Sequence, residues 1–537
     1  MLTPIPLLTA QQMRDCDAHT IQVRGIPSQL LMERAARAAI EVMQSHTQTE
    51  LRAGREILFL CGSGNNGGDG FAMARFLTEE GCGALVAYAG QWDEAAQTPL
   101  ESHMSVECAR QYRLWTEAGG RTVCQLPPLE GRIIVDALLG TDLRGAPRPP
   151  MDTWIRAVNE SDCPVIAIDV PSGVDASSGA VYVDGAALHS VDQGQIPVTA
   201  AVRADVTATM AYPKRGLILY PGAALAGLVH ICDIGIDCKS ISPEMYLLRA
   251  EHLSLLPMRP TYANKGTFGR VAIIGGAVGM CGAVCFAGKA ALRAGIGLCE
   301  LVSSAENRIP LQTLLPEAVM TLLPEMSAAE EVLCEVLSRA DVAVVGCGMG
   351  QSAVAHDRLA HILSMARCPL VLDADALNMI AADDKGIYRA RLRACAARNT
   401  VVITPHLGEA SRLLHKGIRE LLADLPSAAA ALAREYGVIC VLKDTRTIIS
   451  DGHVAYVQDC GNSSMAKGGS GDVLAGVMGA MLCICRRTPL ADTPTLLAAL
   501  AVLLHAMAGD SAAEAMGAYA PMAGELADHV GAVLKDI

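Results

Sequence analysis

The sequence is poor in aromatic residues and in charge, and it contains no basic cluster. Only 4% of its 537 residues are aromatic and 18% are charged, whereas 51% are hydrophobic. A chain this apolar buries enough surface to offset the entropy lost on folding, which excludes disorder for most of it. Its 43 Lys and Arg residues against 56 Asp and Glu give a net charge of −13. We therefore expect small-molecule ligands and no nucleic-acid partner.

Paired cysteine motifs are absent as well. The chain has 19 cysteines but no CxxC pair, and several, such as Cys281 and Cys485, lie inside apolar runs. This usage is typical of reduced thiols packed as small hydrophobic residues. The first residues show neither a basic segment nor a sustained apolar core, so we expect no secretory signal and a cytoplasmic protein.

Two uncharged stretches are about as long as a membrane span. Residues 271–288 contain five glycines in the pattern of a strand and a turn, and residues 493–509 have the Ala/Leu-rich composition of a buried helix. We therefore predict no membrane span.

Short apolar runs alternate with stretches of helical spacing, and this alternation predicts parallel sheets covered on both faces. A break in the pattern near residues 240–250 predicts two domains, 1–240 and 250–537, which fits roughly 100–200 residues per domain. The predicted strands of the first series are 56–61, 84–89, 133–137, 165–170 and 206–210, and those of the second are 270–276, 341–346, 369–375, 400–405 and 438–444.

A glycine-rich loop follows the first strand. Gly62, Gly64 and Gly67 satisfy the GxGxxG pattern, in which glycines let the backbone approach a pyrophosphate at a helix N-terminus. A dinucleotide dehydrogenase is one interpretation. Amide and carboxylate oxygens from the same loop also suit a hard cation or a ribose hydroxyl, and a capped tight turn is a third possibility.

Two further strands of the first half end in aspartate. Asp136 ends IIVDA, and Asp169 ends VIAIDV. Ligands bind at the carboxyl ends of parallel strands, so a site shared with the glycine loop is expected, although a single Asp in this position is often a helix cap.

The motifs GNNGGDG, DALLGT..RG and DVPSGVDA follow one another in the first half, within roughly residues 10–240. In this order they resemble the N-terminal epimerase domain of the bifunctional NAD(P)H-hydrate repair enzymes. The resemblance implies a Rossmann-like doubly wound sheet, interconversion of R and S NAD(P)H hydrates, and a bound potassium ion. It implies that Asn66, Asp136 and Ser172 bind the ion, that Asp169 is catalytic, and that the hydrate contacts Asn65, Asn66, Gly67, Gly68, Asp69, Gly140, Thr141, Asp142, Leu143, Arg144, Gly145, Ala146 and Asp169.

Two residues of the first half depart from the family pattern. Asp142 replaces a usual glycine, so the loop geometry is in question if that glycine serves a positive φ. Arg34 replaces the usual asparagine after LME.

The most informative run of the second half is GNSSMAKGGSGD, residues 461–472, which leads into an apolar helical segment. Small residues entering a helix present free backbone N–H groups, which is typical of an anion site. Asp472 beside it suits phosphoryl transfer to a hydroxyl, with the carboxylate taking the proton. Alternatively, Asp472 is only a negative charge that interacts favourably with the N-terminus of the helix. No Walker A motif occurs.

Other apolar runs of the second half also end in polar residues. Asp373 and Asp375 follow one run, His406 follows the next, and Lys443 begins the segment LKDTRT. These residues are the further candidates for one site at the sheet edge.

The segments KGTFGR, GGAVGMCGA, GCGMG, DADALN, TPHLGE, LKDTRT and GGSGD, within roughly residues 250–530, resemble the NAD(P)H-hydrate dehydratase branch of the ribokinase-like superfamily. The resemblance implies an α/β sandwich in which the S hydrate is phosphorylated by ADP or ATP with Mg²⁺ and then loses phosphate. Asp444 stands where the family usually has glycine. The implied hydrate contacts are Ala283, Gly348, His406 and the catalytic Asp472, and the implied nucleotide contacts are Lys443, Asp444, Thr445, Arg446, Thr447 and Gly471.

We therefore predict a homo-oligomeric bifunctional enzyme, an epimerase (isomerase) fused to a dehydratase (lyase), acting on NAD(P)H hydrates and ADP or ATP. One rival is a kinase of a vitamin alcohol, which would use the same GGSGD chemistry. The other is a non-catalytic nucleotide-binding module, which would leave Asp472 without a task.

Overall fold

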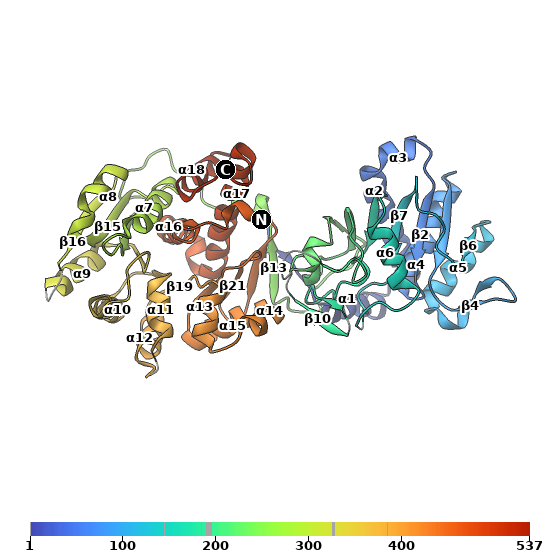
Figure 1. Ribbon diagram of the computed structural model, residues 1–537, viewed down its shortest axis with the longest axis horizontal. Coiled ribbons are helices and arrows are strands. Elements are labelled where there is room, and N and C mark those ends of the chain that lie inside the picture. The colour runs from blue at the N-terminus through green and yellow to red at the C-terminus, as the bar shows by residue number, and fades with distance from the viewer. Residues whose placement is uncertain are drawn as a thin grey trace. The chain divides into compact units, whose positions relative to one another are not determined.

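The computed structural model describes residues 2–143, 145–183, 185–189, 196–324, 328–383 and 385–536 (Figure 1). The chain forms two compact units. One unit is Pro6–Pro243, and the other combines the residues up to Ile5 with those from Glu244 onward.

The first unit is built on a parallel seven-stranded sheet. Its strands are short runs rich in Ile, Val and Leu, and most are fully buried, as expected where helices cover both faces. In spatial order the strands are β12 (Leu228–Cys232), β11 (Val206–Met210), β8 (Val165–Ile168), β7 (Ile133–Ala137), β2 (Ile57–Cys61), β3 (Ala84–Tyr88) and β6 (Thr122–Val123).

Two hydrophobic cores lie on opposite faces of this sheet. Alternate residues of β2 divide between them: Phe59 packs into the core with α1, α2, α4 and α5, whereas Leu58 packs into the core with α6. This confirms the predicted doubly wound α/β fold. The helices are α1 (Ala10–Gln22), α2 (Ser28–His46), α3 (Gln48–Arg52), α4 (Asn65–Glu79), α5 (Val106–Glu117) and α6 (Met151–Asn159).

The second unit contains an eleven-stranded sheet. From β13 to β16 its strands pair in parallel, except that β21 pairs antiparallel with both of its neighbours. All five strands predicted for this half are present. The order is β1 (Ile5–Pro6), β13 (Met245–Leu248), β22 (Ala455–Gln458), β21 (Ile448–Ser450), β20 (Ile439–Leu442), β19 (Val401–Ile403), β18 (Leu370–Leu372), β17 (Val342–Val345), β14 (Arg270–Ile274), β15 (Leu298–Ser304) and β16 (Val319–Leu323).

Helices cover both faces of this sheet, as predicted. One core packs α7, α16, α17 and α18 against residues such as Val271 and Val344 (Figure 1). The helices are α7 (Cys281–Arg293), α8 (Arg308–Leu314), α9 (Ala328–Arg339), α10 (Ala353–Met365), α11 (Asp375–Ala381), α12 (Ile387–Ala396), α13 (Leu407–Leu414), α14 (Ile418–Ala423), α15 (Leu425–Tyr436), α16 (Ser470–Ile484), α17 (Pro494–Met516) and α18 (Ala523–Val533).

Helix α17 is long and apolar enough to cross a membrane, but most of it is buried inside the second unit. It packs beside α16 and α18, which is the core position predicted from its composition. Residues 271–288 likewise form a strand, a turn and part of α7. All 19 cysteines are free thiols.

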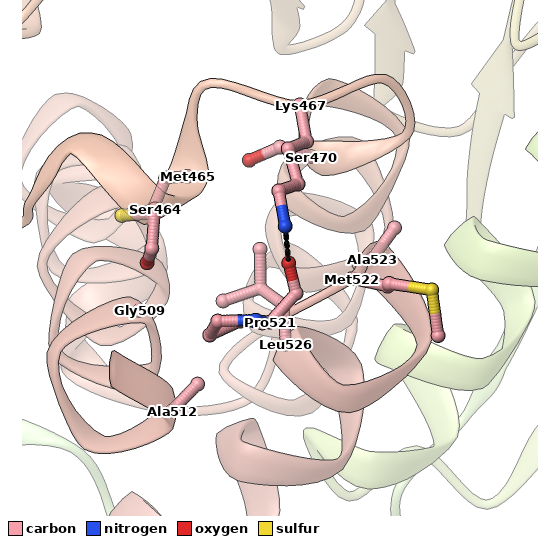
Figure 2. Close-up of a pocket in the computed structure, with 10 residues that line it drawn as sticks. All are labelled: Ser464, Met465, Lys467, Ser470, Gly509, Ala512, Pro521, Met522, Ala523 and Leu526. Carbon is pink, nitrogen blue, oxygen red and sulfur yellow. Dashed lines mark hydrogen bonds between the residues drawn. The ribbon is translucent and has the colours of Figure 1, made fainter. Parts of the chain in front are cut away.

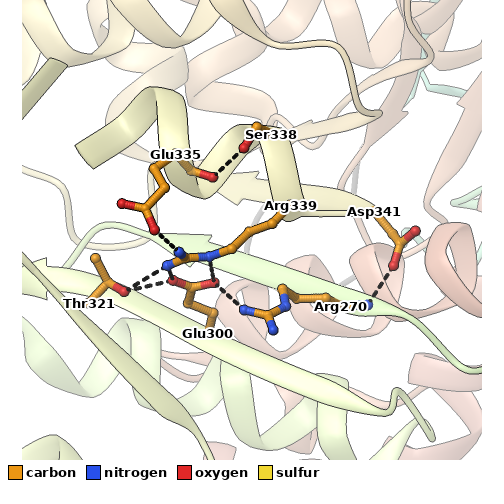
Figure 3. Close-up of polar contacts among 7 residues, drawn as sticks. All are labelled: Arg270, Glu300, Thr321, Glu335, Ser338, Arg339 and Asp341. Atoms are coloured by element: carbon orange, nitrogen blue, oxygen red, sulfur yellow. Dashed lines mark hydrogen bonds and ion pairs between the residues drawn. The ribbon is translucent and has the colours of Figure 1, made fainter. Parts of the chain in front are cut away.

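Glu300 on β15 points to the sheet face opposite this core and is buried there in a polar cluster (Figure 3). Arg270 donates to its carboxylate at 3.0 Å, Thr321 Oγ1 donates at 2.6 Å, and Arg339 of α9 forms a further ion pair. These three donors hold the pKa of Glu300 below its ordinary value despite its burial. The cluster joins α9 to the sheet.

Candidate active sites

The first site lies where the strand order of the first sheet reverses. Chain connections leave β2 toward β3 on one side and return to β7 on the other, so the loops after β2 and β7 border a crevice. The two loops touch: a Cβ on Gly62 would lie 1.9 Å from the Leu138 carbonyl oxygen. Only glycine permits this approach, which explains the first position of the GxGxxG pattern.

A cavity of about 610 Å³ opens at this crevice, between the sheet edge and helices α1 and α2. Gly67 and Gly68 are not among its lining residues, since Gly67 packs against the Gly62 backbone and Gly68 against Met32. Gly145 and Ala146 are not among them either, and Arg144 lies outside the described residues. The predicted residues that line the cavity are Asn65, Asn66, Asp69, Gly140, Thr141, Asp142, Leu143 and Asp169.

Asn66, Asp136 and Ser172, the three predicted potassium ligands, come together below this cavity. Ser172 donates to Asp136 through both Oγ and the backbone N–H, at 2.6 and 2.8 Å. Asn66 Nδ2 donates to the Leu139 carbonyl, which leaves the buried Asn66 Oδ1 without a partner. Burial raises the pKa of Asp136 to about 6. A buried carboxylate beside an unpaired amide oxygen fits a cation.

Asp169 forms an ion pair with Lys214, a contact that the sequence did not indicate. Lys214 is fully buried and also donates to Thr209 Oγ1 at 3.1 Å and to the Met210 carbonyl at 2.9 Å. Asp169 has a φ of 67°, which is rare for a residue other than glycine and is typical of functional positions. The only sequence signal for Lys214 is its place just after the predicted strand 206–210.

Two more carboxylates share this cavity. Burial, followed by the nearby Asp169 and Asp17, raises the pKa of Asp69 well above its ordinary value. The pKa of Asp17 on α1 is raised to about 6, also chiefly by burial. Groups with raised pKa values can hold a proton near neutral pH, so the site contains candidate proton donors beside the Asp169–Lys214 pair. Sequence analysis missed Asp17 because nothing local distinguishes it.

The two family departures of this unit cause no visible strain. Asp142 does not have a positive φ, and it instead forms an ion pair with Arg14 of α1 at 2.7 Å. Arg34 donates to the Ile234 carbonyl at 3.2 Å.

The second site also lies at the carboxyl ends of strands, here β17 to β20. Asp373, after β18, accepts hydrogen bonds from Lys443 Nζ at 2.7 Å and from Thr404 Oγ1 at 2.8 Å. Lys443 therefore neutralises Asp373, and its ammonium group faces the first turn of α16: a Cβ on Gly471 would lie 3.3 Å from it. The predicted nucleotide contacts Lys443 and Gly471 are thus neighbours.

Asp472 lies in the first turn of α16, which begins at a left-handed glycine, Gly469. Its carboxylate, the Cys347 thiol and the Asp373 carboxylate place one atom each within 4.8 Å of one another. Burial and then Asp373 raise the pKa of Asp472 to about 6. The group is still mostly ionised at neutral pH.

The other candidate bases of this site are already engaged. His406 Nδ1 accepts from the Gly408 N–H at 3.0 Å and caps α13, and burial lowers its pKa. Asp375 accepts from the Gly350 N–H at 2.8 Å and braces the GCGMG loop. With Asp373 paired to Lys443, Asp472 is the carboxylate best placed to accept a proton.

The remaining predicted contacts fall into two groups. Ala283 and Gly348 are adjacent, because a Cβ on Gly348 would lie 3.1 Å from Ala283 Cβ. Burial raises the pKa of Asp444 above its ordinary value. The other three nucleotide contacts predicted, Thr445, Arg446 and Thr447, continue from Asp444 between β20 and β21.

Lys467, in the middle of the GNSSMAKGGSGD loop, has a structural contact. Figure 2 shows its ammonium donating to the Pro521 carbonyl, at 2.8 Å. The cavity beside it has a volume of about 10 Å³, room for one water at most. On the other side of α16, His505 donates to the Ser470 carbonyl at 3.0 Å, and burial lowers its pKa to about 4, so it is neutral. Both contacts hold the anion loop in place.

Comparison with known proteins finds a family match in each unit. Residues 271–530 match the family described as NAD(P)H-hydrate dehydratase, and residues 28–216 match the YjeF-related protein N-terminus. The bifunctional NAD(P)H-hydrate repair enzyme of Moorella thermoacetica is 33% identical, over 99% of this chain and 97% of the relative. The Escherichia coli enzyme of the same name is 36% identical, over 88% of this chain and 84% of its own length.

Solved structures similar to the second unit include an ADP/ATP-dependent NAD(P)H-hydrate dehydratase from Bacillus subtilis, co-crystallised with ATP and Mg²⁺. It is 27% identical and covers 54% of this chain and 97% of that chain, with a TM-score of 0.46. Identity above 30% over nearly the full length of both proteins decides the assignment. This chain belongs to the family of bifunctional NAD(P)H-hydrate repair enzymes.

Proposed function

We propose that this chain repairs hydrated NAD(P)H, with the epimerase in the first unit and the dehydratase in the second. The epimerase interconverts the R and S hydrates, and the dehydratase converts the S hydrate to NAD(P)H at the expense of ADP or ATP. The observation that carries the proposal is an ionisable carboxylate, Asp472, beside a glycine-rich helix N-terminus, in a chain related to repair enzymes over its whole length.

The dehydratase reaction follows from the second site. The N–H groups of the first turn of α16 would hold the transferring phosphoryl group, and Asp472 would take the proton of the substrate hydroxyl as the O–P bond forms. Loss of phosphate from the phosphorylated carbon, together with loss of a proton from the neighbouring ring carbon, would then restore the double bond of the nicotinamide ring. The position of Lys443 supports phosphate binding here, because its positive charge lies beside the first turn of α16.

Mg²⁺ would accompany the nucleotide and neutralise its phosphates. The same site would accept ADP or ATP, since Lys443, Gly471 and the loop Asp444 to Thr447 are proposed to contact the nucleotide. Ala283, Gly348 and His406 are proposed to contact the hydrate. His406 would do so through the Nε2 side of its ring, because Nδ1 caps α13.

In the epimerase site we propose a potassium ion bound by Asn66, Asp136 and Ser172. The unpaired Asn66 Oδ1 and the buried Asp136 support a cation there. Bound potassium would supply a fixed positive charge beside the hydrate. Asp169, held by Lys214, is the proposed catalytic group, and Asp69 lines the same cavity as a candidate proton carrier.

A homo-oligomer in the cytoplasm remains our prediction for the state of the enzyme. Light scattering of the purified protein tests the first part, and cell fractionation tests the second.

Turnover of separately purified R and S hydrates, each with ADP or ATP, tests the proposal. We expect recovered absorbance of reduced nicotinamide from the S hydrate with nucleotide, and from the R hydrate only when the first unit is active. A stable phosphorylated alcohol would instead support the kinase interpretation, and nucleotide binding without turnover would support the binding module.

A further inference from the structure

The second unit has another cavity, beside residues that are proposed to contact the hydrate. Its volume is about 570 Å³. Helices α11 and α13, which lie side by side (Figure 1), form most of its wall, and a residue after β17 completes it. The described residues that line it are Gln351, Asn378, Ala381, Ala382, Arg412 and His415.

Two proposed hydrate contacts, His406 and Gly348, flank this cavity. His406 caps α13, the helix that carries Arg412. A Cβ on Gly408 would lie 3.2 Å from His406 Nδ1 and 3.8 Å from Arg412 Nη1, so the guanidinium is close to the histidine ring. On the other side, Gln351 directly follows the GCGMG loop that contains Gly348.

The strand order places the cavity on the hydrate side of the sheet edge. Its lining residues follow β17, β18 and β19, which lie between β20 and β14. The proposed nucleotide contacts from Lys443 to Thr447 follow β20, whereas the proposed hydrate contact Ala283 follows β14. An occupant of the cavity would therefore continue from the hydrate and not from ADP or ATP.

The charges around the cavity favour an anion. Arg412 and His415 are exposed, and no carboxylate is among the described residues that line the cavity. Arg412 Nη2 donates to Asn378 Oδ1 at 2.7 Å, which orients the guanidinium. The planar fork of an arginine matches the oxygens of a phosphate, so an oriented guanidinium at a cavity without carboxylates suits a phosphate group.

The nearest carboxylate on α11 is already engaged. Asp375 accepts hydrogen bonds from the Gly350 N–H at 2.8 Å and from Gln351 Nε2 at 3.2 Å. These contacts turn the carboxylate toward the GCGMG loop, so it does not pair with Arg412.

The proposed substrate carries a phosphate that needs such a place. Only the nicotinamide ring of the hydrate reacts beside Asp472, and the rest of the dinucleotide, with its charged phosphates, extends away from the ring. We infer that Arg412 binds a phosphate group of the hydrate in this cavity. The inference rests on the proposed function. The phosphate belongs either to the pyrophosphate, which both hydrates carry, or to the 2′-phosphate, which only NADPH hydrate carries.

Steady-state kinetics of Arg412→Gln with the S hydrates of NADH and NADPH tests the inference. The KM for the hydrate should rise roughly tenfold, because a charge-assisted hydrogen bond is lost. The kcat and the KM for ADP should stay near their native values, since the ring and the nucleotide bind elsewhere. A rise with both hydrates identifies the pyrophosphate, and a rise with NADPH hydrate alone identifies the 2′-phosphate. Native KM values for both hydrates would overturn the inference.

Two further variants separate phosphate binding from a general effect of charge or packing. Arg412→Lys keeps the charge without the planar fork and should recover part of the affinity for the hydrate. Arg389→Gln is the matched control, because Arg389 is an exposed arginine of α12 that pairs with Glu435 at 2.7 Å, outside the cavity. It should leave every KM at its native value. An equal rise in Arg389→Gln and Arg412→Gln, or an equal rise in the KM for ADP, would contradict the inference.

The native enzyme separates this inference from the proposed function. If it turns over neither S hydrate, both ideas fail. If it turns them over and Arg412→Gln has a native KM for both, only the role of Arg412 is wrong. Thermal unfolding of each variant checks that it is folded. Should Arg412→Gln not fold, Arg412→Lys decides, because a native KM for both hydrates in that variant would contradict binding by the fork.

Discussion

Both sites of this chain place a lysine–aspartate pair at the carboxyl ends of parallel strands, yet the two pairs lie in different surroundings. Lys214, paired with Asp169, is only 1% exposed and lies at a cavity with two more carboxylates, Asp17 and Asp69. Lys443, paired with Asp373, is 20% exposed and faces a helix N-terminus. The surplus of carboxylates suits a cation in the first site, and the N–H groups suit a phosphate in the second.

The comparison shows that one architecture serves opposite ligand charges. In each site the lysine neutralises one carboxylate, and burial raises the pKa of another, Asp69 in the first unit and Asp472 in the second. The chemistry then depends on what the strand-end loops add: an unpaired Asn66 oxygen in one case, and the first turn of α16 in the other.

The largest expected effect comes from removing the base of the second site. Asp472→Asn nearly preserves shape but cannot take the proton, so dehydration should fall roughly 10² to 10⁴-fold. Nucleotide binding should persist, because the helix amides remain. Epimerisation should stay at the native rate, since that reaction belongs to the other unit. Rates on the separate S and R hydrates measure dehydration and epimerisation. A loss of both activities would contradict the assignment of the two reactions to different units.

The two lysines should differ in their contribution to stability. Lys214→Met leaves Asp169 without its buried partner and should lower the free energy of unfolding of the first unit by about 3 kcal/mol. Lys443→Met should cost more, because the charge that it leaves on Asp373 is only 3% exposed, whereas Asp169 is 17% exposed and is better screened by water. Denaturant unfolding of each variant, followed with probes in each unit, measures the difference. Equal losses of unfolding free energy in the two variants would mean that burial does not make the two ion pairs differ in their contribution to stability.

Glu300 extends the comparison to a carboxylate with a structural role, whose pKa is lowered rather than raised. Glu300→Gln should destabilise the second unit by about 2 kcal/mol, less than a fully buried pair because both arginines keep some hydration. The native contribution should be complete above the unfolded pKa of about 4.3 and be lost as pH falls through the lower folded value.

Glu335 is the control for this prediction, since it pairs with the same Arg339 but is 71% exposed. Glu335→Gln should change stability by less than about 0.5 kcal/mol. Unfolding midpoints between pH 3 and pH 7 would refute the assignment if the two variants behaved alike.

The smallest effect is expected at the cation site. Asp136→Asn keeps the size of the side chain but removes its charge, so potassium affinity should fall roughly tenfold or more. Epimerisation should then need more potassium, while dehydration of the S hydrate stays independent of it. Titration of epimerase activity with potassium chloride, against sodium chloride at equal ionic strength, measures the shift. If epimerisation by Asp136→Asn depended on potassium as it does in the native enzyme, Asp136 would not bind the ion.

The strand patterns and the polar residues at their ends were readable from the sequence because they depend on neighbours in the chain. All ten strands predicted for the two sheets are present, and Asp136, Asp169, Asp373 and Asp472 each lie at or after a strand or in the first turn of a helix, as expected. The sequence did not predict the edge strands β12 and β16, whose residues are partly exposed, or the interior strands β15, β21 and β22.

The partners of those aspartates were decided only by the tertiary structure. Lys214 is 45 residues from Asp169, and Lys443 is 70 residues from Asp373, so no local pattern marks either pair. The raised pKa of Asp472 also comes from the tertiary structure, because its burial and its approach to Asp373 arise from packing. Sequence specified which groups carry the chemistry, whereas folding decided which of them are neutralised, because desolvation and charge pairing depend on distance in space.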